Sequence, residues 1–292
     1  MQSPTNSFDK ISPTAIMVAE LRQFTDIPYS KEIAQLVNAQ AVVEKLIENN
    51  LNRPVEVGVW LEGRYKSVNK LIGQATQIIE LASGLQPRGM VMTENPDIIF
   101  IESDLPGILS QKQEIVKKLI GNRPNYHLIP INVTSDPSQF PLHANYLDTQ
   151  KPVVITCEGL MMHLTFAEKQ MVFKNIREML EIYGGMWITP DLNDKVGLNK
   201  MRSFSPGLQN ISRTTAEITG RNVDDYLFEN PDHVKQFAQL QGFTIDSYNM
   251  LEIIDSLTCL EPLKIDVEIA KSMLANAFVS VLKLKNSNPN WV

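Results

Sequence analysis

Cysteine, basic runs and long apolar segments are all scarce in this chain of 292 residues. Its two cysteines, Cys157 and Cys259, are too few for a disulfide framework, so both are expected to be buried thiols. The formal net charge is -6 and no basic tract is present, which argues against general binding to nucleic acid. No apolar run approaches the roughly 20 residues that a membrane-spanning helix needs.

Other familiar signals are missing too. The four histidines (His127, His143, His163 and His233) lack the spacing of zinc ligands, so no metal site is expected. The polar start MQSPTNSFDK does not have the pattern of a signal peptide, and the expected location is the cytoplasm. No internal repeat or low-complexity tract is present. Length and composition agree with a single-domain enzyme.

The most informative stretch is ELASGLQPRG, residues 80–89, which follows a short aliphatic run predicted to be a buried strand at 77–81. Gly84 and Gly89 have the spacing of the two glycines of a phosphate-binding loop, but the Lys and Ser/Thr of that motif are missing. The dinucleotide fingerprint is also absent. An adenosine ligand without phosphates, such as S-adenosylmethionine, fits this glycine turn better, while an ordinary strand-to-helix turn is the alternative.

A second buried strand is predicted at 97–104, and it ends in the carboxylates Glu102 and Asp104. They lie roughly 20 residues beyond Glu80, about the offset at which adenosine sites place an acidic ligand of the ribose. One of them is therefore expected to bind ribose hydroxyls. The alternative is that both only cap the helix that begins near Pro106.

Strands and helices continue to alternate along the middle of the chain. Further strand-like runs follow at 126–133, 152–158 and 186–192. A helix is predicted from Thr165 to about Tyr183, with Glu168 completing a capping box and glycines at its end. This order is typical of a parallel sheet covered on both faces.

The rest of the chain is predicted to cover the site. Helices beginning at Ser12, at Ser30 and near Val59 should form a cap over the ligand, and the second is expected to use one apolar face formed by Ile33, Leu36, Val37, Val43 and Ile47. The strand pattern is lost between the fifth strand and Pro231, which predicts a lid. The expected division is 1–74 cap, 75–192 cofactor-binding core, 193–231 lid and 232–292 the last part of the sheet.

ELASGLQPRG, FIESDLPGILSQK, YHLIPINV and CEGLMMHL, in this order after SPTAIMVAELR, resemble the leucine carboxyl methyltransferase and polyketide O-methyltransferase-like family of S-adenosylmethionine enzymes. The resemblance spans residues 12–192. It implies a class I methyltransferase fold, which is an α/β Rossmann-like sheet of seven strands with helices on both faces. Its last two strands, expected at 244–248 and 278–284, would include an antiparallel one.

The resemblance also implies site residues. Gly84 would belong to the cofactor loop, Asp104 would bind the ribose, Glu158 would close the fourth strand, and Arg22 and Arg64 would hold the cofactor's carboxylate. The chain departs from the family pattern at Asn132, where Asp is usual beside the adenine, and at His163, where Tyr is usual. The full set expected to bind S-adenosylmethionine is Arg22, Arg64, Glu80, Gly84, Asp104, Asn132, Val133 and Glu158.

The function that this pattern favours is transfer of a methyl group to a hydroxyl or carboxylate of a small molecule. His163 is the candidate catalytic residue, because a phenol with a pKa near 10 gains from a general base, although a packed core histidine is the alternative reading. Cys157 lies within a strand-like run and does not suggest thiol catalysis. Three other functions stay open: a protein C-terminal carboxyl methyltransferase, an NAD-dependent oxidoreductase and a non-catalytic cofactor-binding protein.

Overall fold

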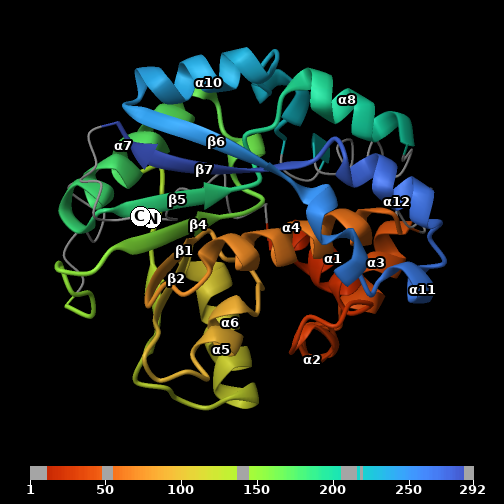
Figure 1. Ribbon diagram of the computed structural model, residues 1–292. Coiled ribbons are helices and arrows are strands. Elements are labelled where there is room, and N and C mark those ends of the chain that lie inside the picture. Colours follow the sequence, from red (N-terminus) through yellow and green to blue (C-terminus); the bar gives the residue numbers. More distant parts are fainter. Residues whose placement is uncertain (1–11, 48–54, 137–144, 205–215, 218–219, 286–292) are drawn as a thin grey trace, which may run out of the picture.

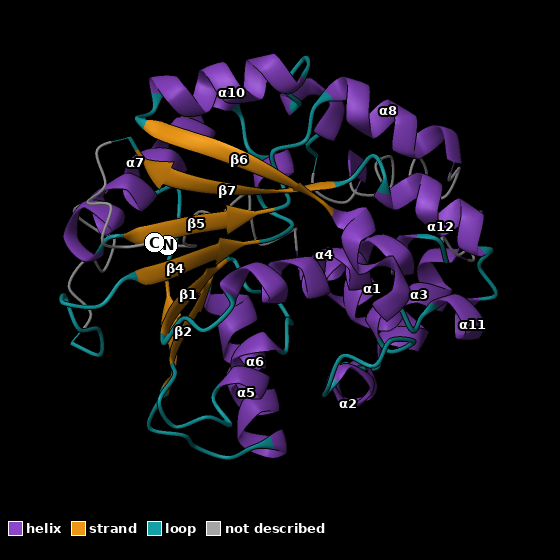
Figure 2. Ribbon diagram, viewed as in Figure 1, coloured by secondary structure: helices purple, strands orange, loops and turns teal. Residues whose placement is uncertain are grey.

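A seven-stranded sheet runs through the middle of the molecule, as Figure 2 shows for the computed structural model, which describes residues 12–47, 55–136, 145–204, 216–217 and 220–285. Its strands lie in the order β3-β2-β1-β4-β5-β7-β6. The strands are β1 (Gln77–Leu81), β2 (Ile99–Asp104), β3 (Tyr126–Pro130), β4 (Val153–Cys157), β5 (Gly185–Thr189), β6 (Phe243–Asn249) and β7 (Phe278–Leu284). Parts of the predicted cap and lid lie outside the described residues.

Five strands are parallel, and β7 is antiparallel to both of its neighbours, β5 and β6. The predicted seven-stranded α/β sheet with an antiparallel strand near its end is therefore confirmed. The central strands β1 and β4 are buried along their whole length, as the aliphatic runs QIIEL and VVITC require between two helical layers. Two predicted strands are too long, because β3 ends at Pro130 and β5 ends at Thr189.

Helices cover both faces of the sheet (Figure 1). One face holds α4 (Val57–Ile72), α5 (Arg88–Met92) and α6 (Pro106–Leu119), with α12 (Val267–Leu274) packed on α4, and the other face holds α7 (Phe166–Tyr183) and α10 (Pro231–Leu240). The side chains of β1 alternate between them, since Ile78 packs into the first core and Ile79 into the second. The predicted capping box of α7 is present, formed by Thr165 and Glu168.

The remaining elements gather beyond the carboxyl ends of the strands or at the edge of the sheet. They are α1 (Ser12–Arg22), α2 (Ser30–Leu36), α3 (Ala39–Ile47), α8 (Lys195–Phe204), α11 (Leu260–Leu263) and the 3-10 turns η3 (Met161–His163), η4 (Val223–Tyr226) and η5 (Met250–Ser256). None of the helices in the described parts of the chain combines the length and apolar character needed to cross a bilayer.

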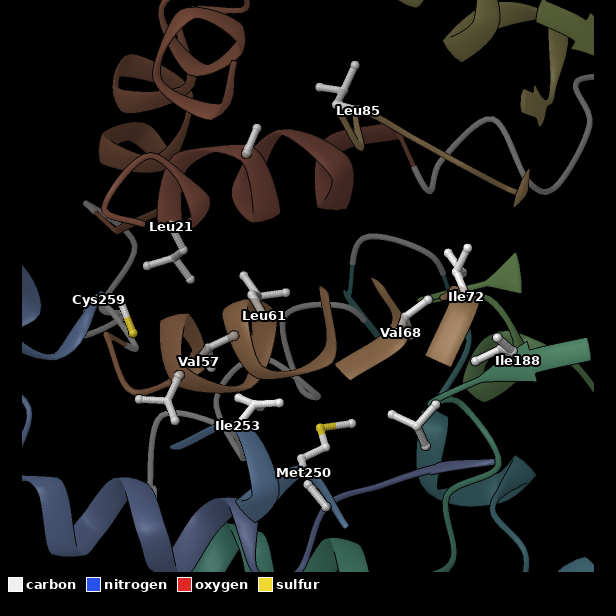
Figure 3. Packing of buried hydrophobic residues seen from close by; sticks show 14 of the residues in the cluster. Leu21, Val57, Leu61, Val68, Ile72, Leu85, Ile188, Met250, Ile253 and Cys259 are labelled. Carbon is white, nitrogen blue, oxygen red and sulfur yellow. The ribbon is translucent and has the colours of Figure 1, made fainter. Parts of the chain in front are cut away.

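The N-terminal helices are joined to the sheet by one continuous core. Figure 3 shows Leu21 of α1 and Ile253 of η5 against the first turns of α4, and Val68 farther along α4 on the way to Ile188 of β5. Cys259 lies in the same core and Cys157 lies in the other, so the prediction of two buried free thiols is confirmed. Helix α4 therefore packs against both the N-terminal cap and the sheet.

The prediction of one helix from Ser30 to Ile47 is wrong. Asn38 has a left-handed backbone (φ 50), which ends α2 before α3 begins at Ala39. The break turns the two halves to different sides, so Leu36 is 38% exposed while Ile33 and Val43 are buried. The sequence showed this only as an asparagine, a residue that tolerates the left-handed region.

Candidate active site

A cavity opens at the carboxyl ends of β1 and β4, where the strand order reverses and open α/β sheets bind their ligands. It holds about 1060 Å³ of empty space, counting the part open to solvent. The structure brings the whole set expected to bind the cofactor, together with His163, to the wall of this cavity: Arg22, Arg64, Glu80, Gly84, Asp104, Asn132, Val133, Glu158 and His163. They come from α1, α4, η3 and the ends of β1, β2, β3 and β4. We call it the first cavity.

The loop after β1 turns sharply through two left-handed residues. Ala82 has φ 51 and Gly84 has φ 53, so the glycine is required by its backbone, whereas a Cβ there would meet only Ala15 at 3.8 Å. The Asp104 carboxylate fixes the turn, because its Oδ2 accepts from the Gly84 N–H at 2.7 Å and its Oδ1 from the Leu105 N–H at 2.7 Å. Burial raises the pKa of Asp104 although these hydrogen bonds oppose the shift. The turn and the acid at the end of β2 thus form one unit.

Gly89 and Glu102 have other roles than the sequence suggested. Gly89 lies inside α5, its N–H donates to Glu102 Oε1 at 3.1 Å, and a Cβ there would stand 2.5 Å from both that oxygen and Tyr126. Glu102 is fully buried and paired with Lys112, away from the cavity wall. The expectation that Gly89 belongs to the ligand loop is therefore wrong. Of the two carboxylates in β2, only Asp104 lines the cavity.

Lys112 of α6 is a supporting residue that sequence reasoning missed. Its buried Nζ donates to Gln86 O at 2.5 Å and to Ser83 Oγ at 3.4 Å, and it pairs with Glu102. It therefore ties the loop after β1 to β2. A signal was present, since Lys112 lies three residues from both Leu109 and Ile115 on the buried face of the helix.

Five charged side chains are buried together beside the cavity. Arg88 pairs with both Glu80 and Glu158, and Arg64 Nε lies 3.3 Å from Glu158 Oε2. Arg22 donates to the Leu85 carbonyl at 3.4 Å, and its Nε has no hydrogen-bond partner. Three guanidinium groups thus face two carboxylates, which leaves an excess of positive charge in the cluster formed by Arg22, Arg64, Glu80, Arg88 and Glu158.

The pKa of the Arg22 guanidinium reflects its burial and this excess charge. Burial and the neighbouring Arg64 lower the pKa of Arg22 to about 10, although Glu158 opposes the change. Glu158 behaves in the opposite sense, because Arg88 and Arg64 hold its pKa below the usual value in spite of burial. Among the described residues the guanidinium of Arg22 contacts no carboxylate, and a ligand carboxylate would satisfy it.

Asp191 fixes the turn between β4 and η3, and sequence reasoning placed it only as part of the fifth strand. The strand ends before it, and its carboxylate accepts from the N–H groups of Gly159 (2.8 Å), Leu160 (2.7 Å) and Met161 (3.1 Å). Gly159 needs the support, because it has φ 77. Asp191 thus holds the segment that runs from Glu158 to His163.

The His163 ring lies at the end of this segment and is 6% exposed. Its Nδ1 has no hydrogen-bond partner, and its backbone carbonyl accepts from Arg221, which also forms a two-point ion pair with Glu168. Burial, followed by repulsion from Arg221 and Lys169, lowers the pKa of His163 to about 4. The imidazole is therefore neutral at neutral pH.

A second cavity adjoins the first one. Thr14, Val18, Arg64, Gly159 and His163 line both of them. The rest of its wall is mostly apolar and comes from α1, α4, the segment around η3, α8 and η4: Met17, Leu21, Val57, Trp60, Leu61, Met162, Asn193, Leu198, Met201 and Val223. It holds about 950 Å³, again counting space open to solvent. His163 therefore lies between a cavity with several charged side chains and a mostly apolar one.

Asn132 and Val133 follow β3 and form another part of the first cavity's wall. Asn132 Oδ1 accepts from the Thr134 N–H at 3.1 Å and from its hydroxyl at 2.8 Å, so the amide oxygen is used within its own turn. Val133 is buried, and its carbonyl accepts from Asn175 of α7. Both residues line the cavity, and the place of Asn132 beside an adenine stays a prediction.

We predict an acid-sensitive contribution of His163 to stability. Its folded pKa lies below its unfolded value, so protonation favours unfolding; the contribution is unchanged above about pH 6.5 and is lost as the pH falls toward 4. Between pH 7 and 4.5 the free energy of unfolding of the natural protein should fall by about 2 kcal/mol more than that of His163→Gln. Urea unfolding at both pH values measures the difference. Equal losses in the two proteins would contradict the neutral buried ring.

Comparison with known proteins places the chain in a sequence context. The model of the leucine carboxyl methyltransferase family matches residues 30–177. A protein of Mycobacteroides abscessus named as an S-adenosyl-L-methionine-dependent methyltransferase is 26% identical over 192 residues, which make up 61% of this chain and 58% of that protein. The match thus spans a little over half the length of that relative.

Solved structures give the same fold. A crystal structure of a methyltransferase from Thermobifida fusca superposes with a TM-score of 0.56 at 17% identity, covering 92% of this chain and 94% of that one. An O-methyltransferase family protein from Burkholderia thailandensis gives a TM-score of 0.50 at 10% identity, covering 90% of this chain and 64% of that one. At such low identity these two structures bear on the fold alone.

Proposed function

Because the chain belongs to the leucine carboxyl methyltransferase family, and so by family to the S-adenosylmethionine-dependent methyltransferases, we propose that it moves a methyl group from that cofactor to an oxygen of a small molecule. The observation that carries the proposal is the pair of adjoining cavities with a shared wall at His163. The first cavity has charged and polar side chains among apolar ones and suits a charged nucleoside, and the second is mostly apolar and suits an organic acceptor.

The residues of the first cavity fit the cofactor. Arg22 offers a guanidinium without an anion to the amino acid carboxylate, and Asp104 at the end of β2 stands where an acid can accept from ribose hydroxyls. The left-handed turn at Gly84 brings bare backbone to the cavity. Asn132 and Val133 form the part of the wall that we assign to the adenine. S-adenosylmethionine supplies a methyl group already activated as a sulfonium.

The protein's own contribution is alignment and exclusion of water. Trp60 of α4, Met201 of α8 and Val223 of η4 enclose the second cavity, and α1 lies along both cavities. We assign residues 193–231 to a lid over the acceptor, of which 205–215 and 218–219 lie outside the described residues. An acceptor held there would present its oxygen at the shared wall, next to the His163 ring.

Filling the second cavity should separate the two binding events. Met201 is 3% exposed and lines only the second cavity, so Met201→Trp is expected to abolish methylation of acceptors while S-adenosylmethionine binds as before. The matched control is Lys200→Trp on the exposed face of α8, which should keep both properties. Calorimetry measures cofactor binding and formation of S-adenosylhomocysteine measures turnover.

The same assays test the function itself. The natural protein should bind S-adenosylmethionine and not NAD, and it should methylate at least one member of a panel of phenols, aromatic acids and peptides ending in leucine. Binding of the cofactor without turnover of any acceptor would favour the alternative of a non-catalytic cofactor-binding protein. Turnover of the peptides alone would show a protein C-terminal carboxyl methyltransferase. Failure to bind the cofactor would refute the proposal.

A further inference from the structure

The second cavity contains an unsatisfied hydrogen-bond donor and an unsatisfied acceptor. Among its described lining residues, polar side chains come from Thr14, Arg64, His163 and Asn193. Arg64 is already paired with Glu158 and stacks over Trp60, with Cζ 4.8 Å from the ring centroid. The buried atoms Asn193 Nδ2 and His163 Nδ1 have no hydrogen-bond partner in the part of the chain that the structure describes. Buried polar atoms of this kind are uncommon in folded proteins and indicate a ligand that completes them.

Both atoms belong to residues that line the same cavity, so one ligand can complete both. In the neutral tautomer that carries its proton on Nε2, His163 Nδ1 accepts a hydrogen bond, and Asn193 Nδ2 donates one. A hydroxyl group can donate and accept at once, whereas an ionised carboxylate can only accept. A carboxylate would also bring a full charge into a mostly apolar wall whose guanidinium is already paired with Glu158, which is costly. The polar atoms of this cavity therefore favour a hydroxyl over a carboxylate.

The walls of the second cavity indicate the shape of the rest of the acceptor. Trp60, Met162 and Met201 line the cavity, and aromatic and thioether side chains both pack well against a flat ring. We propose that the methyl acceptor is a phenol whose oxygen is bound by Asn193 and whose proton passes to His163. This inference rests on the proposed methyltransferase activity and specifies the acceptor of that same site. Asn193 becomes the residue that selects the acceptor.

The reaction then balances. The phenol oxygen attacks the sulfonium methyl carbon of the donor, so a carbon–oxygen bond forms as the carbon–sulfur bond breaks and its electron pair stays on sulfur. The phenol proton moves to His163 Nδ1. Arg221 and Lys169 disfavour the imidazolium, so His163 returns the proton to water when the products leave. The products are a methyl ether, a thioether and one proton.

The test compares 2-naphthol, 2-naphthoic acid and naphthalene, which share one ring system and differ in the polar group. Calorimetry is done with S-adenosylhomocysteine bound, so that no turnover occurs. Naphthol should bind the natural protein at least about 10-fold more tightly than naphthoate at pH 7. Asn193→Ala should weaken naphthol binding roughly threefold to 10-fold and leave naphthalene unchanged, because a single hydrogen bond is lost. Asn199→Ala, an exposed asparagine of α8, is the matched control.

Several results would overturn the inference. They are naphthoate binding as tightly as naphthol, equal loss of naphthol and naphthalene affinity in Asn193→Ala, and no binding of any probe. With S-adenosylmethionine, naphthol should be methylated, and His163→Ala should slow this step while naphthol still binds. Methylation of naphthoate or of a leucine peptide instead would refute the phenol as acceptor and would still support methyltransferase activity. Loss of cofactor binding in the natural protein would be a failure of the proposed function, not of this inference alone.

Discussion

Replacing Arg22 with methionine should lower the affinity for S-adenosylmethionine by about 100-fold and make the protein without ligand slightly more stable. Among the described residues, Arg22 is the one guanidinium of the charged cluster that contacts no carboxylate, so it is the one expected to pair with the carboxylate of the cofactor. The affinity falls because this pair is lost, and a charge-assisted pair is worth about 1.5–3 kcal/mol. The gain in stability without ligand has a separate cause. The folded pKa of Arg22 lies below its unfolded value, so at neutral pH its charge destabilises the folded state.

Calorimetry with S-adenosylmethionine and urea unfolding without it measure both effects. The free energy of unfolding should rise by about 1–2 kcal/mol. Arg22→Lys should bind with intermediate affinity, because an ammonium keeps the charge and loses the two-point geometry. Arg177→Met on α7 is the control and should change neither quantity by much, because Arg177 is remote from the cavity wall. An affinity within threefold of the natural protein would show that Arg22 does not hold the carboxylate.

Replacing Asp191 with alanine should destabilise the protein by about 3–5 kcal/mol. Three backbone N–H groups lose their acceptor in a buried turn, and each unsatisfied donor costs about 1–3 kcal/mol before relaxation. The same change should abolish methyl transfer, since the turn carries Glu158 and His163 to the two cavities. Urea unfolding measures the first effect and turnover measures the second.

Asp194→Ala is the matched control for this prediction. The Asp194 carboxylate accepts from two N–H groups at the start of α8, outside the buried turn, so its loss should cost only about 1 kcal/mol. Asp191→Asn should lie between the two, because an amide keeps one acceptor oxygen. Similar losses for Asp191→Ala and Asp194→Ala would mean that the turn is held by its own packing and not by the carboxylate.

Much of the cofactor side of the site could be predicted from the sequence. The strands β1, β2, β3 and β4 each end in a short polar or glycine-containing stretch, and parallel strands bring such ends to one edge of the sheet. Gly84 and the acidic end of β2 could therefore be placed before the fold was known, whereas the choice of Asp104 and the role of Glu158 came from the resemblance to a family. Arg22 and Arg64 came only from the resemblance to a family, since a lone arginine carries no information about its partners.

The supporting residues could not be predicted in the same way. Arg88, Lys112 and Asp191 act through contacts with residues 8 to 70 positions away in the chain, and only Lys112, which has the spacing of the buried face of its helix, is distinguished from a surface charge by its sequence neighbours. The break at Asn38 was hidden for a different reason. A left-handed residue leaves the hydrophobic pattern on both sides intact, so periodicity alone joined α2 to α3.

Helix α1 belongs to both compartments at once. Thr14 and Val18 touch each of them, Arg22 faces the polar one, and Met17 and Leu21 face the apolar one. A ligand that fixes the position of α1 in one cavity also fixes the wall that α1 contributes to the other cavity. Donor and acceptor should therefore bind cooperatively, each tightening the other by the same factor, and the order in which they are added should matter to the rate of assembly and not to the final affinity.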